Sequence, residues 1–310
     1  MQVFFNRLLS YVDLWWRVAR APFLTASLGP VLLGNAIAYH ATGQIDWLIF
    51  TLTIVGALCG HLGANIINDY YDHLSGADDR NTAYTPFSGG SRMIQAGIIS
   101  ANKVRHAAWV CFSITIICGI VLLIYRQLWG LIGFGLAGIG LGMVYSSFPW
   151  KLSYRGWGEL AVALAFGPVI ILGTFYAQTA AWSGMALVTS IPVGLLVGLI
   201  LYINEIQDEE SDRRTGKYTL VVIINDTQRA LQVYRRVLFF TFLWMLGFSL
   251  TGIIPVWNIA VIILWPLGWR LWKLTKQPYQ HVNELLPVNA GTIGLQFLAT
   301  LILAAGFLIK

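Results

Sequence analysis

The sequence predicts an all-α membrane protein with about nine transmembrane helices, and two observations support this prediction. Of its 310 residues, 57% are hydrophobic and 11% are charged, whereas a soluble domain carries about 25% charged residues. The apolar residues also fall into runs of about 20, the length that spans a bilayer. Because backbone polar groups in lipid must bond within their own segment, runs of this length are helices rather than strands.

Nine such runs follow one another, near residues 22–40, 47–67, 107–125, 129–147, 159–178, 185–203, 236–254, 257–275 and 288–309. Before them, residues 1–21 mix Phe, Leu and Trp with Arg and Asn, which predicts an interfacial helix leading into the first span. Residues 68–106 and 204–235 are predicted as long functional loops. No soluble domain is visible, so residues 1–310 are predicted to form a single transmembrane domain.

The distribution of Lys and Arg predicts the orientation. With nine spans, the side that holds the N-terminus has 18 of these residues, and the other side has Arg126 and Lys310. The N-terminus is therefore expected in the cytoplasm, as in a protein of the bacterial plasma membrane. The net charge of +6 then indicates orientation and contact with anionic membrane lipids. Nucleic-acid binding is not expected, and no obligate protein partner is inferred.

Nine of the 14 acidic residues gather in two short stretches. Residues 68–79 are N-D-Y-Y-D-H-L-S-G-A-D-D, and residues 204–217 are N-E-I-Q-D-E-E-S-D-R-R-T-G-K. They follow the second and the sixth span, which places both on the cytoplasmic side. Four helices separate equivalent points of the two stretches. This spacing predicts two four-helix pseudo-repeats that face one shared cavity, with the ninth span closing the bundle.

The acidic stretches predict a magnesium site. Carboxylates this dense repel one another unless a cation lies between them. If the spans continue as helices, Asn204, Asp208 and Asp212 share one face, and the first stretch does the same. Mg²⁺ is usually held by one or two carboxylates together with a substrate's phosphates. On the second span, His61 lies on the face that also carries Asn68 and Asp72, and it is interpreted as a polar core residue. The predicted metal ligands are Asp69, Asp72, Asp208 and Asp212.

The paired motifs resemble those of the UbiA superfamily of intramembrane prenyltransferases. N-D-Y-Y-D at 68–72 is followed by Gly76 and Asp78, and N-x-x-x-D-x-x-x-D at 204–212 is followed by R-R-T-G-K. Nine spans, a cytoplasmic acidic cavity and a four-helix repeat also fit that family's fold, which the resemblance implies for nearly the whole chain. Gly76 stands where the hydroxybenzoate branch more often has a third Asp, so the third acidic role passes to Asp78.

Within the superfamily, the chain is most similar to the 1,4-dihydroxy-2-naphthoate polyprenyltransferases of menaquinone synthesis. The similar segments are A-R-A-P-F-L-T (19–25), D-x-x-x-G-x-D (72–78), T-P-F-S-G-G-S-R-M-I-Q (85–95) and Y-S-S-F-P-W-K-L-S-Y-R-G-W-G-E-L (145–160). In the first of them, Ala21 separates the Arg and Pro that are adjacent in the family.

The resemblance implies electrophilic aromatic substitution by an allylic cation from a polyprenyl diphosphate, with Mg²⁺ bound by the four aspartates. The implied acceptor is 1,4-dihydroxy-2-naphthoate, which would lose its carboxylate to give a demethylmenaquinone. Tyr145 is assigned a catalytic role, because aromatic faces attract cations. The residues assigned to substrate binding are Arg20, Asn68, Asp78, Arg92, Lys151, Arg155, Asn204 and Lys217.

Two alternatives stay open at this point. A prenyltransferase of this kind can take another acceptor, such as 4-hydroxybenzoate or homogentisate, because ring recognition rests on a few residues spread over several helices. A cation-coupled transporter would instead carry its acidic residues near the bilayer midplane on broken helices. The acidic residues of this chain are expected at span ends, which counts against a transporter.

Overall fold

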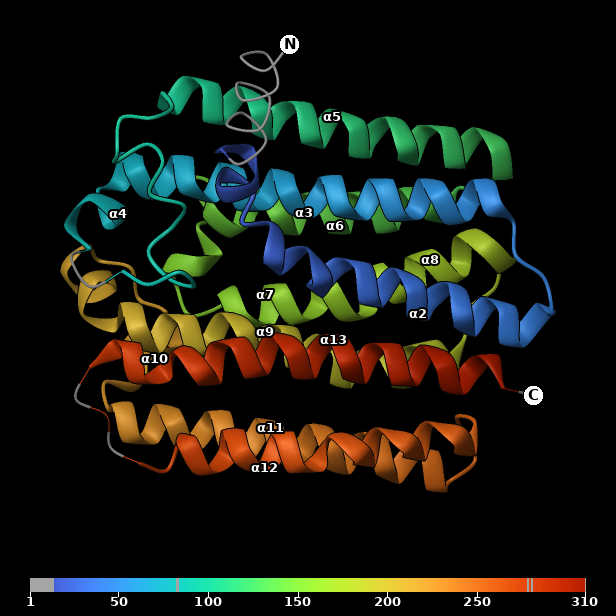
Figure 1. Cartoon of the computed structure of the whole chain (residues 1–310). Helices are drawn as coiled ribbons and strands as arrows, with labels where there is room; N and C mark the ends of the chain where they lie inside the picture. The colour runs from blue at the N-terminus through green and yellow to red at the C-terminus, as the bar shows by residue number, and fades with distance from the viewer. Residues whose placement is uncertain (1–13, 82–83, 278, 280, 310) are drawn as a thin grey trace, which may run out of the picture.

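The computed structural model describes residues 14–81, 84–277, 279 and 281–309, and these residues form a bundle of helices that run alongside one another (Figure 1). The described residues contain no strand. The longer helices are α2 (Thr25–Thr42), α3 (Trp47–Ser75), α5 (Ala101–Arg126), α6 (Gly130–Ser146), α8 (Ile170–Thr179), α9 (Gly184–Arg214), α11 (Thr227–Leu250), α12 (Trp265–Leu274) and α13 (Leu286–Leu308). The shorter helical segments are η1 (Ala21–Leu24), α4 (Ala77–Arg80), η2 (Leu152–Tyr154), α7 (Gly158–Leu164), η3 (Ala165–Val169), α10 (Leu220–Ile224), η4 (Val256–Leu264) and η5 (Val282–Leu285).

The predicted all-helical membrane fold is confirmed, but the predicted count of nine spans is not. In the part of the chain that the structure describes, seven helices are long and apolar enough to cross a membrane. Helix α6 is apolar but shorter. The run predicted at 257–275 divides into the 3₁₀ helix η4 and helix α12, with Pro266 in the first turn of α12. Proline has no backbone N–H and favours the start of a helix, which accounts for the division.

Helices α3 and α9 continue well beyond the apolar runs that predicted them. Helix α3 has 29 residues and α9 has 31, so both acidic stretches begin on helix ends inside the ranges predicted as loops. Gly76 ends α3 with a left-handed backbone, at φ 75°, a conformation that glycine adopts without steric cost. The second range also contains α10 and the start of α11.

The N-terminal interfacial helix was predicted over 1–21, and most of that range lies outside the described residues. Residues 14–18 are helical. Val18 is fully buried in a cluster with Ile66, Ile67 and Ile99. The start of the described chain is thereby packed against the acidic end of α3.

Close helix contacts fix α3 and α9 in place. Helix α3 packs along α5, and α9 packs against α7, η3, α11 and α13. A Cβ on Gly63 of α3 would lie 3.0 Å from the Phe112 ring, and one on Gly167 of η3 would lie 2.5 Å from the carbonyl oxygen of Ser190 on α9. Small residues at such crossings let membrane helices approach closely.

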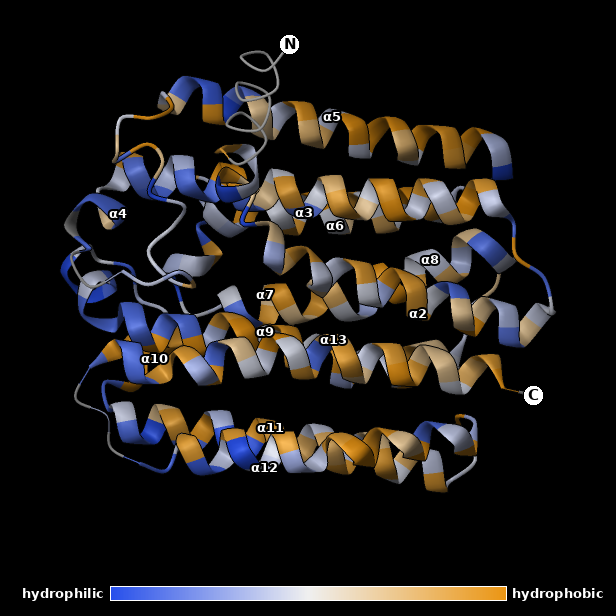
Figure 2. Ribbon diagram, viewed as in Figure 1, coloured by the Kyte–Doolittle hydropathy of each residue, from blue (hydrophilic) through white to orange (hydrophobic). Residues whose placement is uncertain are grey.

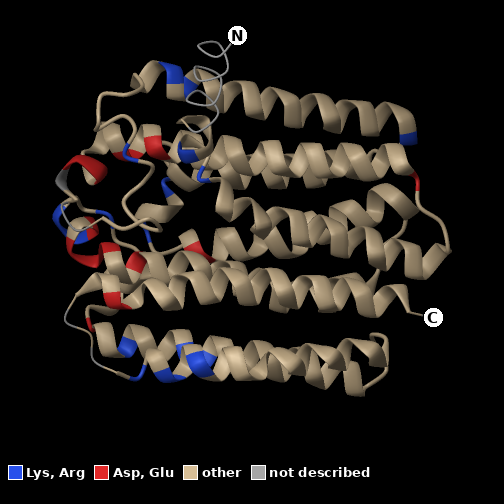
Figure 3. Ribbon diagram, in the orientation of Figure 1, with Lys and Arg blue, Asp and Glu red and all other residues tan. Residues whose placement is uncertain are grey.

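Apolar residues cover most of the helical surface in the middle of the bundle (Figure 2). Charged residues gather mainly at one end (Figure 3). At the other end, Asp46 caps α3 by accepting bonds from the backbone N–H groups of Leu48 and Ile49, and it also accepts one from the hydroxyl of Tyr125 at 2.9 Å. Asp46 is therefore occupied in capping α3, and the clustered charges of the opposite end are the place to look for chemistry.

Candidate active site

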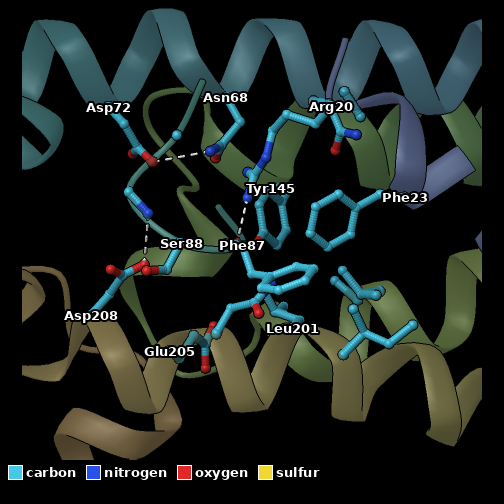
Figure 4. A pocket seen from close by; sticks show the side chains of 18 of the residues that line it. Arg20, Phe23, Asn68, Asp72, Phe87, Ser88, Tyr145, Leu201, Glu205 and Asp208 are labelled. Carbon is cyan, nitrogen blue, oxygen red and sulfur yellow. Dashed lines mark hydrogen bonds between the residues drawn. The ribbon is translucent and has the colours of Figure 1, made fainter. Parts of the chain in front are cut away.

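A cavity with about 1230 Å³ of empty space, its opening included, lies between the acidic ends of α3 and α9. Figure 4 shows side chains from both helices pointing into it. Nine of the 13 site residues predicted from the sequence line this cavity: Arg20, Asn68, Asp72, Asp78, Tyr145, Asn204, Asp208, Asp212 and Lys217.

On the α3 side, a set of hydrogen bonds holds Asp72 in place. The amide of Asn68, one turn earlier, donates to Asp72 Oδ2 at 3.0 Å, and the hydroxyl of Tyr154 donates to Oδ1 at 2.8 Å. Asn68 in turn accepts a bond from the hydroxyl of Ser146 at 2.5 Å. Asp72 as a whole is 4% exposed, so the orientation of its carboxylate is set by protein donors.

On the α9 side, the segment that follows α4 holds Asp208. The amide of Asn81 donates to Asp208 Oδ1 at 2.8 Å, and the backbone N–H of Gly89 donates to Oδ2 at 3.2 Å. Asn204, one turn deeper, accepts a bond from the amide of Asn289 on α13 at 2.5 Å. Asp208 therefore depends on residues that follow the first acidic stretch in the sequence.

Lys217 joins the two sides. Its Nζ lies 3.5 Å from Asp72 Oδ2 and 3.7 Å from Asp212 Oδ1, and its side chain is 14% exposed. The turn that brings it there includes Gly216, at φ 72°, and a bond from the Lys217 N–H to the Asp212 carbonyl. Burial lowers the pKa of the ammonium group, but the carboxylates of Asp212 and Asp72 outweigh burial and hold the pKa of Lys217 well above its usual value. Lys217 is therefore a fixed cation.

Some carboxylate oxygens of the site have no hydrogen-bond partner, and they show whether a metal ion would fit. Asp69 Oδ1 and Asp212 Oδ2 are buried and have no hydrogen-bond partner, although Asp69 Oδ2 accepts a bond from the backbone N–H of Ser91. Such unpaired buried oxygens are costly, and a cation would satisfy them. Among the described residues, no three His, Cys, Asp or Glu side chains lie close enough to hold a metal ion by themselves. The residues thus fit a Mg²⁺ that arrives with phosphate oxygens.

Residues that follow α4 supply part of the cavity wall. The lining includes Asn81, Phe87, Ser88, Gly89 and Gly90. Gly89 and Gly90 have φ of 75° and 71°, and a Cβ on Gly90 would lie 2.5 Å from an Asp78 oxygen. Only residues without a side chain allow this close approach. Burial, together with the carboxylates of Asp72 and Asp69, raises the pKa of Asp78 to about 9.

Deeper in, the cavity becomes apolar and aromatic. Tyr145, Phe23 and Phe87 point into it together (Figure 4). The guanidinium of Arg20 donates to the Phe87 carbonyl at 2.7 Å and lies 4.9 Å from the Phe23 ring centroid. His61 lines the inner wall, where its Nδ1 lies 2.5 Å from the Ser27 hydroxyl. The bond between helices agrees with the interpretation of His61 as a polar core residue.

Four predicted residues do not line the cavity. Asp69 is buried and bonded to Ser91 as described. Arg92 bonds the Asp78 carbonyl and lies 4.5 Å from the Tyr84 ring centroid. Lys151 lies 4.7 Å from the Tyr154 ring centroid. Arg155 is exposed and donates to a neighbouring carbonyl.

Sequence reasoning missed several lining residues. Glu205 lines the cavity, is 4% exposed and leaves Oε2 without a hydrogen-bond partner. Its place in the second acidic stretch, one helical turn before Asp208, was a usable signal. Asn81, Phe87 and Ser88 lie in an irregular segment without periodicity, and the adjacent Gly-Gly pair was the only local indication of a special backbone.

The model of the UbiA prenyltransferase family matches residues 27–308. The chain belongs to this family. It is therefore a prenyltransferase, as its sequence predicted.

Several curated relatives cover most of the chain. It is 29% identical to a 1,4-dihydroxy-2-naphthoate octaprenyltransferase of Mycobacterium tuberculosis, over 95% of this chain and 96% of the relative. It is also 29% identical to the protein of the same name in Bacillus subtilis, over 81% and 78%. A UbiA homologue from Archaeoglobus fulgidus, solved with GPP and Mg²⁺, matches with a TM-score of 0.67 at 14% identity, over 94% of this chain and 99% of that chain. This structural likeness concerns the fold.

Proposed function

We propose that the protein transfers a polyprenyl group from a polyprenyl diphosphate to 1,4-dihydroxy-2-naphthoate, and that Mg²⁺ holds the diphosphate. The observation that carries this proposal is the pair of facing carboxylate groups, with Lys217 between them, at the mouth of a cavity that is apolar further in. The names of the curated relatives support the acceptor. The A. fulgidus homologue, solved with GPP and Mg²⁺, supports the donor and the metal.

Asp72, Asp208 and Asp212 line the cavity and would hold the metal, with the unpaired Oδ1 of Asp69 as the fourth proposed ligand. When bound, Mg²⁺ supplies positive charge that stabilises a departing diphosphate. Lys217 contributes a second, fixed positive charge at the same end of the cavity, and charge placed in advance lowers the barrier because it needs no reorganisation during the reaction.

The inner part of the cavity suits an allylic cation. Tyr145, Phe23 and Phe87 present aromatic side chains there, and aromatic faces attract cations. The apolar walls exclude water, which would otherwise capture the cation. The prenyl tail of the donor is apolar and would lie along these walls.

In the proposed reaction, the ring carbon that bears the carboxylate forms a bond to the allylic carbon. The bond from the allylic carbon to the diphosphate oxygen breaks, and its electron pair leaves with the diphosphate. Loss of CO₂ returns an electron pair to the ring, so no base has to remove a ring proton. The product is a demethylmenaquinone in its quinol form. Of the cations predicted to bind substrate, Arg20 and Lys217 line the cavity, so we assign the acceptor carboxylate to Arg20 rather than to Lys151 or Arg155.

The acceptor is tested by supplying purified protein with polyprenyl diphosphate, Mg²⁺ and equal concentrations of 1,4-dihydroxy-2-naphthoate, 4-hydroxybenzoate or homogentisate. We expect the naphthoate to react fastest, with a product mass that shows loss of CO₂. Faster turnover of either other acceptor would overturn the acceptor assignment and leave prenyl transfer intact. Full turnover in excess chelator would overturn the metal assignment.

We further propose that the protein lies in a bacterial plasma membrane with the cavity open to the cytoplasm, because Lys and Arg gather at the cavity end (Figure 3). Single cysteines at Gln44 and Asn102 test this orientation with a membrane-impermeant thiol reagent. We expect the residue 102 cysteine to react only from inside and the residue 44 cysteine only from outside. Labelling of both from one side would contradict the orientation.

A further inference from the structure

A second hollow lies on the outer edge of the bundle, between α11 and α12. Its lining shares no residue with the cavity described above. Gly268 of α12 brings the two helices together, since a Cβ there would lie 2.6 Å from the Phe242 ring of α11. We call this hollow the edge groove. It is lined by Gln232, Arg235, Arg236, Leu238, Phe239, Trp265, Gly268, Trp269 and Trp272.

One wall of the edge groove is a row of tryptophans. Trp265, Trp269 and Trp272 lie one helical turn apart on α12 and stack in sequence, with ring centroids 6.1 Å and then 4.8 Å apart. Phe239 of α11 meets Trp265 edge to face. Trp269 is 41% exposed. Indole rings have an apolar body and a polar N–H, and they concentrate where membrane hydrocarbon meets the headgroups.

The rim of the edge groove is strongly basic. It includes Arg235, Arg236, Lys273 and Lys276. Within the described part of the chain, none of these four forms an ion pair with Asp or Glu. The Nζ atoms of the two lysines lie over the tryptophans instead, 5.5 Å from the Trp269 centroid and 3.9 Å from the Trp272 centroid.

Orientation alone does not account for the position of these charges. Arg235 and Arg236 lie two turns inside α11 and line the groove, whereas charges that only set orientation need no hollow. Arg235 is tied to the Thr275 carbonyl just after α12. Arg236 is exposed. The groove therefore offers a guanidinium at one end and apolar aromatic surface along its length.

We propose that the edge groove binds an anionic glycerophospholipid. Its headgroup phosphate would lie against Arg235 and Arg236, since guanidinium groups pair with phosphate through two N–H donors. An acyl chain would lie along Phe239 and Trp265. Basic pockets between membrane helices on the cytoplasmic side recognise anionic headgroups in this way. The site is separate from the reaction cavity and does not depend on the identity of the acceptor.

The test compares phosphatidylglycerol with phosphatidylcholine by native mass spectrometry of the full chain in detergent. We expect the wild-type protein to retain phosphatidylglycerol in preference. Arg236→Gln should weaken its binding about fivefold, the effect of one charge of about 1 kcal/mol. Lys103→Gln is the matched control, because Lys103 is an exposed cation at the same end of the bundle, on α5. That variant should bind like the wild type.

A second variant separates the aromatic contribution. Trp269→Ala should weaken binding of both lipids and leave the preference for phosphatidylglycerol in place. An equal loss in Lys103→Gln and Arg236→Gln would overturn the proposal in favour of diffuse surface attraction. Displacement of the lipid by millimolar inorganic phosphate would overturn it in favour of a free-anion site. Unfolding temperatures of both groove variants equal to that of the wild type would exclude misfolding as the cause of weaker binding.

Discussion

The acidic ends of α3 and α9 carry the same pattern, Asn followed one turn later by Asp, but the two aspartates are held differently. Asp72 on α3 is bonded by Asn68 of its own helix and by Tyr154. Asp208 on α9 is bonded by Asn81 and Gly89, which follow α3 in the sequence. The first half of the chain therefore completes the carboxylate site of the second half. The two sides therefore form one interlocked site, although each sequence motif by itself predicts a pair of metal ligands.

The largest expected effect comes from removing either aspartate. Asp72→Ala and Asp208→Ala should each lower turnover at least 100-fold, a loss of about 2.7 kcal/mol of barrier lowering. Glu210→Ala is the control: Glu210 lies on α9 next to these ligands, but it is exposed and paired with Arg214, so turnover should stay within about twofold. If either aspartate variant kept a tenth of the wild-type rate, that residue would not be a principal ligand.

Removing the cation that joins the two sides should affect stability, a different quantity from turnover. Lys217→Gln leaves Asp72 and Asp212 buried without their shared partner, and breaking a buried pair of this kind costs about 3–5 kcal/mol. We expect a lower unfolding temperature in chelator, partly restored by Mg²⁺ with inorganic diphosphate. Arg214→Gln, at an exposed ion pair, should leave the temperature nearly unchanged. An unaltered unfolding temperature for Lys217→Gln in chelator would argue against the bridge.

A smaller effect separates the two ways of holding an aspartate. Asn81→Ala removes the bond from the end of α4 to Asp208, and Asn68→Ala removes the bond within α3 to Asp72. Hydrogen bonds to charged groups contribute about 1.5–3 kcal/mol, so each variant should lower turnover about 10- to 100-fold and raise the Mg²⁺ concentration for half-maximal rate. If Asn81→Ala behaved like the wild type, α9 would form its side of the site without the first half of the chain.

The smallest effect concerns how closely each of the two helices packs against its neighbours. A Cβ on Gly194 of α9 would collide with the Ala163 carbonyl of α7, whereas a Cβ on Gly60 of α3 would meet Thr115 at an ordinary 3.5 Å. Gly194→Ala should therefore lower the free energy of unfolding by about 1–3 kcal/mol, the usual cost of overpacking. Gly60→Ala should be tolerated. Equal unfolding temperatures for the two variants would show that α9 is no more tightly held than α3.

The sequence predicted the aspartates of the site because helical periodicity continues from the apolar spans into the acidic stretches. Asp72 and Asp208 could be placed on the cavity faces by counting turns. Residues 84–92 could not be placed in this way, because their course depends on the left-handed backbones of Gly89 and Gly90 and on bonds to a distant helix. Periodicity also did not predict that a new helix, with Pro266 in its first turn, begins within the eighth apolar run.

The cations were harder to assign than the acids. Lys and Arg flank every span on the side that they orient, so sequence position alone does not separate Lys217, which lies between the carboxylates, from Arg155, which lies outside the cavity. The difference arises from the turn at Gly216, which directs Lys217 back over Asp212. That turn is a feature of the tertiary structure rather than of composition.

The most direct test of the interlocked site is Mn²⁺ binding, measured by electron paramagnetic resonance on purified protein with a non-reactive prenyl diphosphate analogue. Mn²⁺ replaces Mg²⁺ here because it is paramagnetic and also prefers oxygen ligands. We predict that Asp72→Asn on α3 and Asp212→Asn on α9 each abolish the bound Mn²⁺ signal, because each removes a carboxylate that lines the cavity. A full bound signal in either variant would mean that one helix end holds the metal alone, which would contradict an interlocked site.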